Sequence, residues 1–162
     1  MRPMESRARF WLAVVSFAAM LVCAVVVLIP VLEQGGLPRA SWLRLAFQPA
    51  CHQISERCLD LGPGPLPICA RCAGLYAGGL AGLLATLVSG RRSRFRLRWI
   101  VIAAAPSVLD FGLGLVHLPT LPTWPRFIFA LVPGFLAGLL LADAVCEIAT
   151  PRDPETADSR IT

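Results

Sequence analysis

The sequence predicts an all-α, polytopic membrane protein with four transmembrane helices and one extracytoplasmic loop that contains cysteine and histidine. Hydrophobic residues make up 56% of the 162 residues and charged residues only 15%, whereas soluble domains carry about 25% charged residues. The mean hydropathy is +0.68. Four apolar runs reach the length of about 20 residues that a helix needs to cross a bilayer. Because lipid leaves no solvent partner for backbone polar groups, these runs are predicted to be helices.

The four predicted spans cover residues 10–32, 68–89, 99–118 and 127–149. The first span follows three arginines, as the apolar core of a signal peptide would, but it is longer than the usual core of about 7–15 residues. No small-x-small cleavage pattern follows it, so we expect an uncleaved span. The second span contains one charge, Arg71, and the third contains Asp110 and His117.

The distribution of arginine predicts that both termini face the cytoplasm. Ten of the 15 arginines fall in the segments that would then be cytoplasmic, which are 1–9, 90–98 and 150–162. The outer segments, 33–67 and 119–126, carry four. The run from Arg91 to Arg98 is predicted to contact anionic lipid headgroups. Its short length and few apolar members argue against a nucleic-acid site.

The long outer loop contains two further patterns. Residues 40–47 (ASWLRLAF) mix apolar and basic side chains, which predicts a short helix in the membrane interface. Residues 61–67 (LGPGPLP) contain three prolines and therefore predict a stiff turn rather than a regular helix. The polar tail from Pro151 is expected to fray.

Small residues at four-residue spacing predict which helices pack closely. The second span carries Gly74, Gly78 and Gly82, and the fourth span carries Gly134 and Gly138. Such faces let two helix backbones approach each other in a membrane. We therefore expect these two faces to meet.

Six cysteines form two groups. Cys23 and Cys146 lie within apolar runs and are expected to be small buried residues. The other four fall within 22 residues, beside one histidine, and they are Cys51, Cys58, Cys69 and Cys72. The CxxC at residues 69–72 begins a predicted helix, so both sulfurs fall on one face. The free N–H groups of that helix end favour thiolate, and Arg71 adds positive charge.

Three interpretations of this cluster stay open. A metal ion, most plausibly zinc, would be held by Cys51, His52, Cys69 and Cys72, with Cys58 as a substitute ligand. A redox pair of Cys69 and Cys72 would instead pass electrons to a quinone, with Arg71 polarising the quinone or lowering a thiol pKa. In helix count and CxxC position the chain resembles the quinone-linked oxidoreductases of the DsbB and vitamin K epoxide reductase kind.

The third interpretation is a permanent staple, Cys51–Cys69 or Cys58–Cys72, in an oxidising compartment, and the protein would then be a small structural or assembly subunit of the membrane. If residues 49–57 were helical, the Cα atoms of Cys51 and Cys58 would be roughly 10.5 Å apart. That separation exceeds the span of a disulfide, about 4.4–6.8 Å. Those two residues would then not bond to each other.

One stretch resembles a known signature. Cys51-His52-Gln53, Glu56-Arg57 and the run from Cys69 to Gly78 (CARCAGLYAG) are similar to the pattern CHQ…ER…CxRCxGxYxG. This pattern belongs to a bacterial family of predicted membrane proteins, domain-of-unknown-function family 2085. A looser similarity continues through Pro106, Asp110, Arg126, Gly134 and Gly138. The family often has Ser at the position of Cys58, which implies that the other cysteines and His52 matter more. The resemblance implies no activity, and we lean towards a protein that is not an enzyme.

Polar side chains inside the predicted spans form the last candidate group. A charged carboxylate at the membrane centre costs at least about 2.5–3.5 kcal/mol, so Asp110 should face the bundle interior and either find a partner or be protonated. His117 follows two turns later on the same face, and Tyr76 and Arg126 complete the set. These residues could form a polar track to the cysteines, for protons or a metal. Alternatively, Asp110 could simply lock helices together.

Overall fold

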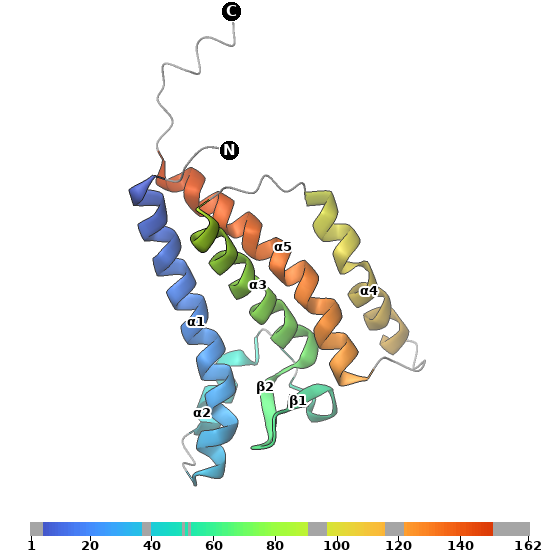
Figure 1. Ribbon diagram of the computed structural model, residues 1–162. Coiled ribbons are helices and arrows are strands. Elements are labelled where there is room, and N and C mark those ends of the chain that lie inside the picture. The colour runs from blue at the N-terminus through green and yellow to red at the C-terminus, as the bar shows by residue number, and fades with distance from the viewer. Residues whose placement is uncertain are drawn as a thin grey trace, which may run out of the picture.

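The fold is a bundle of helices with a small hairpin at one end (Figure 1). A computed structural model describes residues 5–36, 40–49, 51, 53–90, 97–115 and 122–150. Its elements, in chain order, are the helices α1 (Ser6–Gln34) and α2 (Ala40–Phe47), the 3₁₀ helix η1 (Ser55–Arg57), the strands β1 (Cys58–Asp60) and β2 (Pro65–Cys69), and the helices α3 (Ala70–Ser89), α4 (Leu97–Leu115) and α5 (Thr123–Ala149).

The centre of the bundle is the pair of helices α3 and α5, which run parallel to each other (Figure 1). Helix α1 packs against both of them, and α4 packs against α5 on the other side. Ala8 and Leu12 at the start of α1 share a buried cluster with Ala142 and Cys146 near the end of α5. The start of α1 and the end of α5 therefore lie at the same end of the bundle.

Glycine makes the close contact between α3 and α5. A Cβ atom added at Gly134 would lie 2.6 Å from the carbonyl oxygen of Leu75, and one added at Gly78 would lie 2.8 Å from the backbone nitrogen of Phe135. Neither position has room for a side chain, because the opposing atoms belong to the backbone. Gly74, Gly82 and Gly138 are equally crowded. The two glycine faces that the sequence singles out thus lie against each other.

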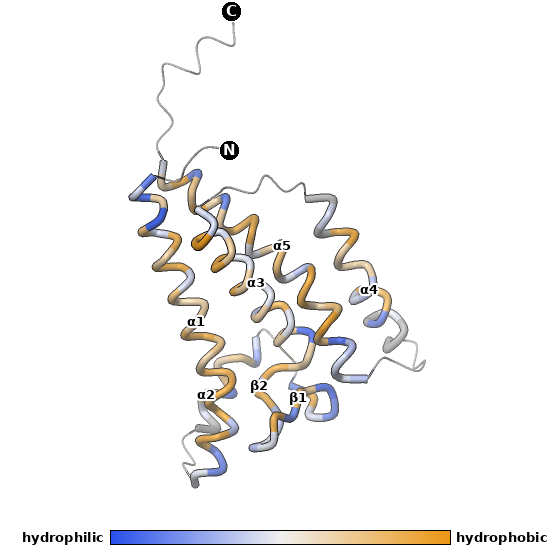
Figure 2. Tube along the Cα trace, viewed as in Figure 1, coloured by the Kyte–Doolittle hydropathy of each residue, from blue (hydrophilic) through white to orange (hydrophobic). Residues whose placement is uncertain are grey.

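Within the described part of the chain, three helices are long and apolar enough to span a membrane: α1, α3 and α5. The fourth predicted span, 99–118, is not confirmed. Helix α4 contributes a shorter apolar stretch, Val101–Asp110, and residues 116–121 lie outside the described part of the chain. Figure 2 shows apolar residues along the length of the long helices and hydrophilic ones around the hairpin.

The two-stranded antiparallel sheet is an addition to the predicted all-α architecture. Its register pairs Cys58 with Cys69 and Asp60 with Pro65. Prolines disfavour helix here, and the turn between the strands needs positive φ angles, which Gly62 and Gly64 supply at 106° and 131°. Of the stiff turn expected over residues 61–67, residues 61–64 connect the two strands of the hairpin, whereas residues 65–67 belong to β2, which leads directly into α3.

Candidate thiol site

The hairpin and α3 together position two of the cysteines. Cys69 is the last residue of β2 and the N-cap residue of α3, so Cys72 follows within the first turn of the helix. One helical turn brings residues three apart onto the same face. The two Sγ atoms are consequently 3.5 Å apart.

The third cysteine of the site lies 18 residues before Cys69 in the chain. Cys51 follows α2, and its backbone N–H donates to the carbonyl of Phe47 at 3.0 Å. Its Sγ accepts a hydrogen bond from the backbone N–H of Cys69, with an N···S distance of 3.1 Å. The sulfurs of Cys51, Cys69 and Cys72 all lie within 4.8 Å of one another. We call these three residues the thiol site.

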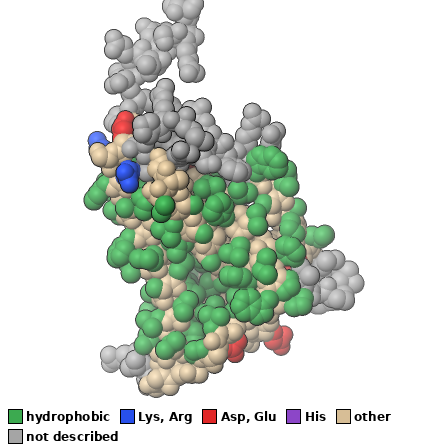
Figure 3. Space-filling view, in the orientation of Figure 1, with side chains coloured by type: hydrophobic (Ala, Val, Ile, Leu, Met, Phe, Trp, Pro, Cys, Tyr) green, Lys and Arg blue, Asp and Glu red, His purple; other side chains and the backbone are tan. Residues whose placement is uncertain are grey.

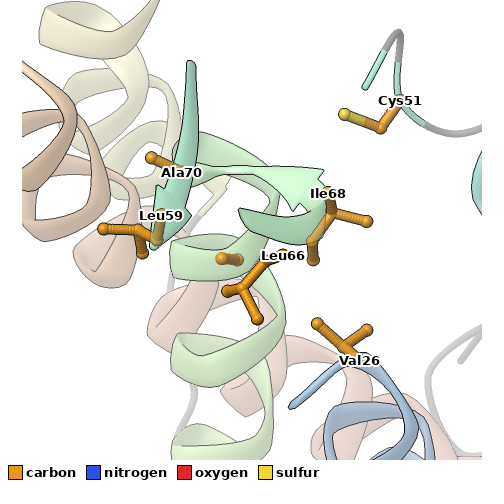
Figure 4. Packing of buried hydrophobic residues seen from close by; sticks show 7 residues of the cluster. Val26, Cys51, Leu59, Leu66, Ile68 and Ala70 are labelled. Atoms are coloured by element: carbon orange, nitrogen blue, oxygen red, sulfur yellow. The ribbon is translucent and has the colours of Figure 1, made fainter. Parts of the chain in front are cut away.

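Apolar side chains from four elements surround the thiol site. Cys51 is buried in one cluster with Val26 of α1, Ile68 and Leu66 of β2, Leu59 of β1 and the alanines at the start of α3. Figure 4 shows Cys51 on its own segment, beyond Ile68, with Val26 on the α1 side. Cys69 and Cys72 are half-buried. Apolar side chains therefore line the site on the side of α1.

Local hydrogen-bond donors stabilise a thiolate at Cys69. The hydrogen bond between the two thiols of the CxxC acts most strongly, and together with the backbone N–H groups of Cys72 and Arg71 and the Cys51 thiol it lowers the pKa of Cys69 to about 5. Burial opposes this shift. These donors belong to the protein, so the negative charge at Cys69 does not depend on water.

Cys58 lies near the thiol site but is not one of its members. Its Sγ donates to the carbonyl oxygen of Ile54 at 3.2 Å. Burial, with a smaller contribution from the charges of Cys51 and Cys69, raises the pKa of the Cys58 thiol to about 11. Cys58 is therefore a neutral thiol at pH 7, held by the backbone rather than turned towards the other sulfurs.

The assumption of a helix over residues 49–57 is wrong. Gln53 has a positive φ of 52°, and only Ser55–Arg57 form a single 3₁₀ turn. The Gln53 side chain donates to the carbonyl of Arg44 at 2.5 Å, which ties this loop to α2. The estimate of the separation between Cys51 and Cys58, which depended on that helix, no longer holds.

An ion-pair network joins α3, α4 and α5 beside the thiol site. The carboxylate of Asp110 on α4 pairs with the guanidinium of Arg71 on α3. It also lies 3.1 Å from Nε of Arg126 on α5. Asp110 and Arg126 are buried, with 3% and 7% of their surfaces exposed. The Arg71 side chain is thus directed to Asp110, and its backbone N–H reaches Cys69.

The remaining predicted site residues are placed as follows. His52 and His117 lie outside the described residues, as does the run from Arg91 to Arg96. Tyr76 lies one turn beyond Cys72 in α3 and is exposed. The polar track from Asp110 through His117 to the cysteines stays a prediction.

Sequence reasoning missed the contact that fixes α2. Arg44 binds both carboxylate oxygens of Glu33, the last acidic residue of α1, with two hydrogen bonds of 2.7 Å. It also donates to the carbonyl of Pro65 at 2.8 Å. One guanidinium therefore holds the end of α1, α2 and β2 together, close to Cys51. The only signal in the sequence was one acid and one base on either side of a Gly-rich turn.

Comparison with known proteins gives a family but no activity. The profile of DUF2085, described as a predicted membrane protein, matches residues 51–141. The uncharacterized protein MJ1492 of Methanocaldococcus jannaschii is 30% identical over 88 residues, which cover 52% of this chain and 56% of that protein. The chain thus spans about half the length of this relative. No solved structure matches.

Proposed function

The chain belongs to the DUF2085 family of predicted membrane proteins, and from that premise we propose that its thiol site holds one metal ion. Cys51, Cys69 and Cys72 supply three thiolates, zinc is the ion, and His52 is the fourth ligand. The observation that carries this proposal is the convergence of three sulfurs from two distant segments within 4.8 Å. The protein is then a metal-binding membrane protein rather than an enzyme.

The donor set fits zinc in chemistry and in spacing. Thiolates are soft ligands that favour zinc, and imidazole completes a common set of four. A tetrahedral ion with Zn–S distances of about 2.3 Å holds its sulfurs about 3.8 Å apart. The 3.5 Å separation of the Cys69 and Cys72 sulfurs is close to that value. Little movement of Cys69 and Cys72 is therefore needed for both to bind one ion.

The proposed setting is the inner membrane of a bacterium, with both chain ends in the cytoplasm and the hairpin outside. The arginine distribution supports this orientation. The arrangement in which the start of α1 and the end of α5 share one end of the bundle is compatible with it. In this setting the run from Arg91 to Arg98 contacts anionic headgroups.

Metal content and thiol counting test the proposal together. Protein purified in detergent is analysed for metal by mass spectrometry, and its thiols are titrated before and after a neutral chelator, 1,10-phenanthroline. We expect about one zinc per chain and three thiols that react only after chelation. Cys69→Ser should lose the zinc, whereas Cys58→Ser, a matched change of a buried cysteine outside the thiol site, should keep it. Equal zinc in both variants would contradict the assignment.

A second candidate is a thiol–disulfide oxidoreductase, in which Cys69 and Cys72 are the redox pair. Two observations favour it: the 3.5 Å separation of the two sulfurs and the lowered pKa of Cys69, which makes it a good attacking thiolate. The two thiols would form a disulfide by giving two electrons and two protons to a quinone. Metal-free protein in which quinone forms this disulfide, and a quinol or dithiol reduces it, would support this candidate. Metal-free protein with a disulfide that resists reduction would support a staple instead.

A further inference from the structure

The lipid-facing surface of α1 shows how far the apolar zone of the membrane extends along this helix. Large apolar side chains are exposed along this helix from Phe10, at 64%, to Val31, at 47%. These residues are 21 positions apart, about 32 Å along a helix that rises about 1.5 Å per residue. The hydrocarbon core is about 30 Å thick. The apolar zone therefore ends near Val31.

The contacts of the thiol site place it inside the apolar zone, before the zone ends near Val31. Val26 of α1 packs in the same buried cluster as Cys51 and Ile68, five residues before Val31. Along the helix this is roughly 7–8 Å inside the apolar zone. Helix α5 gives a second measure, because Phe127 packs on the same cluster while Trp124, one turn nearer the start of α5, is 56% exposed. Apolar surface thus extends past the thiol site on both sides.

Polar contacts mark the edge itself. The ion pair of Glu33 with Arg44 lies two residues beyond Val31, and the same guanidinium holds the carbonyl of Pro65 at the start of β2. Trp42 of α2 is 73% exposed, and tryptophan is enriched at the level of the headgroups. The turn of the hairpin and α2 therefore lie at the membrane surface. Figure 3 shows hydrophobic side chains over one face of the bundle, with charged ones gathered at its two ends.

We propose that the thiol site is submerged in the apolar zone beneath the hairpin turn and α2, and that it takes neutral, lipid-soluble reactants and chelators in preference to charged, water-soluble ones. This inference names the class of molecule that reaches the site of the proposed function. The inference rests on the proposed function, which gives the site its importance, but it holds whichever ion is bound.

Thiol labelling in lipid nanodiscs tests the depth, because both membrane faces are then open to reagents. The protein is first stripped with 1,10-phenanthroline and reduced. It is then treated with N-ethylmaleimide, which is neutral, or with a maleimide that carries a sulfonate. Leu61→Cys adds a reference thiol at an exposed position in the hairpin turn. Peptide mass spectrometry gives the rate at each cysteine.

We expect N-ethylmaleimide to modify Cys69 and Cys72 within a few-fold of its rate at position 61. The sulfonated reagent should react at least about tenfold more slowly at Cys69 and Cys72 than at position 61. In protein unfolded with detergent the two reagents should not discriminate. Equal rates of the sulfonated reagent at all three positions would overturn the proposal, and so would failure of the neutral reagent to modify Cys69 and Cys72. Since the protein is metal-free, failure of the zinc proposal would leave these rates unchanged.

Discussion

Replacing Gly78 by alanine tests the packing of α3 against α5. A Cβ atom there would lie 2.8 Å from the backbone nitrogen of Phe135 and 3.1 Å from the carbonyl carbon of Gly134, with the carbonyl oxygen of Leu131 nearer still. These atoms belong to a helix backbone and cannot rotate away, so the helices must separate. Overpacking costs about 1–3 kcal/mol, and the upper end of about 3 kcal/mol applies here because the opposing atoms are backbone atoms. Alanine returns about 1 kcal/mol through its helix propensity. We expect Gly78→Ala to lower the free energy of unfolding by about 2 kcal/mol.

The neighbouring glycine provides the control. A Cβ atom at Gly79 would meet only the carbonyl oxygen of Gly134, at an ordinary 3.8 Å. Gly79→Ala should therefore be neutral or slightly stabilising, since it gains helix propensity without a clash. The assay is the folded fraction in mixed micelles as the proportion of sodium dodecyl sulfate rises. About 2 kcal/mol corresponds to roughly a 30-fold change in the unfolding equilibrium. Equal stability of the two variants would refute the close-packed interface.

Three further predictions concern charges and thiols. Asp110→Asn should destabilise the protein by about 3–5 kcal/mol, because it removes the one carboxylate of a buried network; a loss below about 1 kcal/mol in the same assay would contradict that network. Glu33→Gln should cost less than about 1 kcal/mol, because its pair with Arg44 is partly exposed and screened, and a larger loss that persists at high salt would be inconsistent with this placement. In metal-free protein, the rate of alkylation by iodoacetamide should rise with pH through about 5 at Cys69 and only near pH 11 at Cys58. The reason is that the thiolate is the reacting form and its fraction grows as the pH passes the pKa. The same pH profile at both residues would oppose the assigned roles.

The helices could be predicted from the sequence because their signals are local. Apolar length identified the candidate spans, and the four-residue spacing of Gly74, Gly78 and Gly82 identified a face for close packing. The proline-rich segment 61–67 was correctly excluded from helix. The hairpin itself was not predicted, because strands of three and five residues with prolines between and within them carry little periodic pattern.

The site was harder to predict because it depends on contacts between distant segments. The spacing of Cys69 and Cys72 fixes their geometry within one helical turn, so that part follows from the sequence. The place of Cys51 depends on how the loop after α2 folds back, and the left-handed backbone at Gln53 has no helical or strand signature. A partner for Asp110 could be expected from the sequence, but the sequence did not identify it, because Arg71 and Arg126 were both candidates.

X-ray absorption at the zinc edge tests the central claim, that Cys51, Cys69 and Cys72 bind one ion together. Zinc-loaded protein should show about three sulfur neighbours at about 2.3 Å. Cys51→Ser, which lacks one ligand and is therefore loaded with excess zinc, should show about two sulfur neighbours, whereas Cys58→Ser should keep three. A spectrum without sulfur neighbours, or one that Cys51→Ser does not change, would contradict the account.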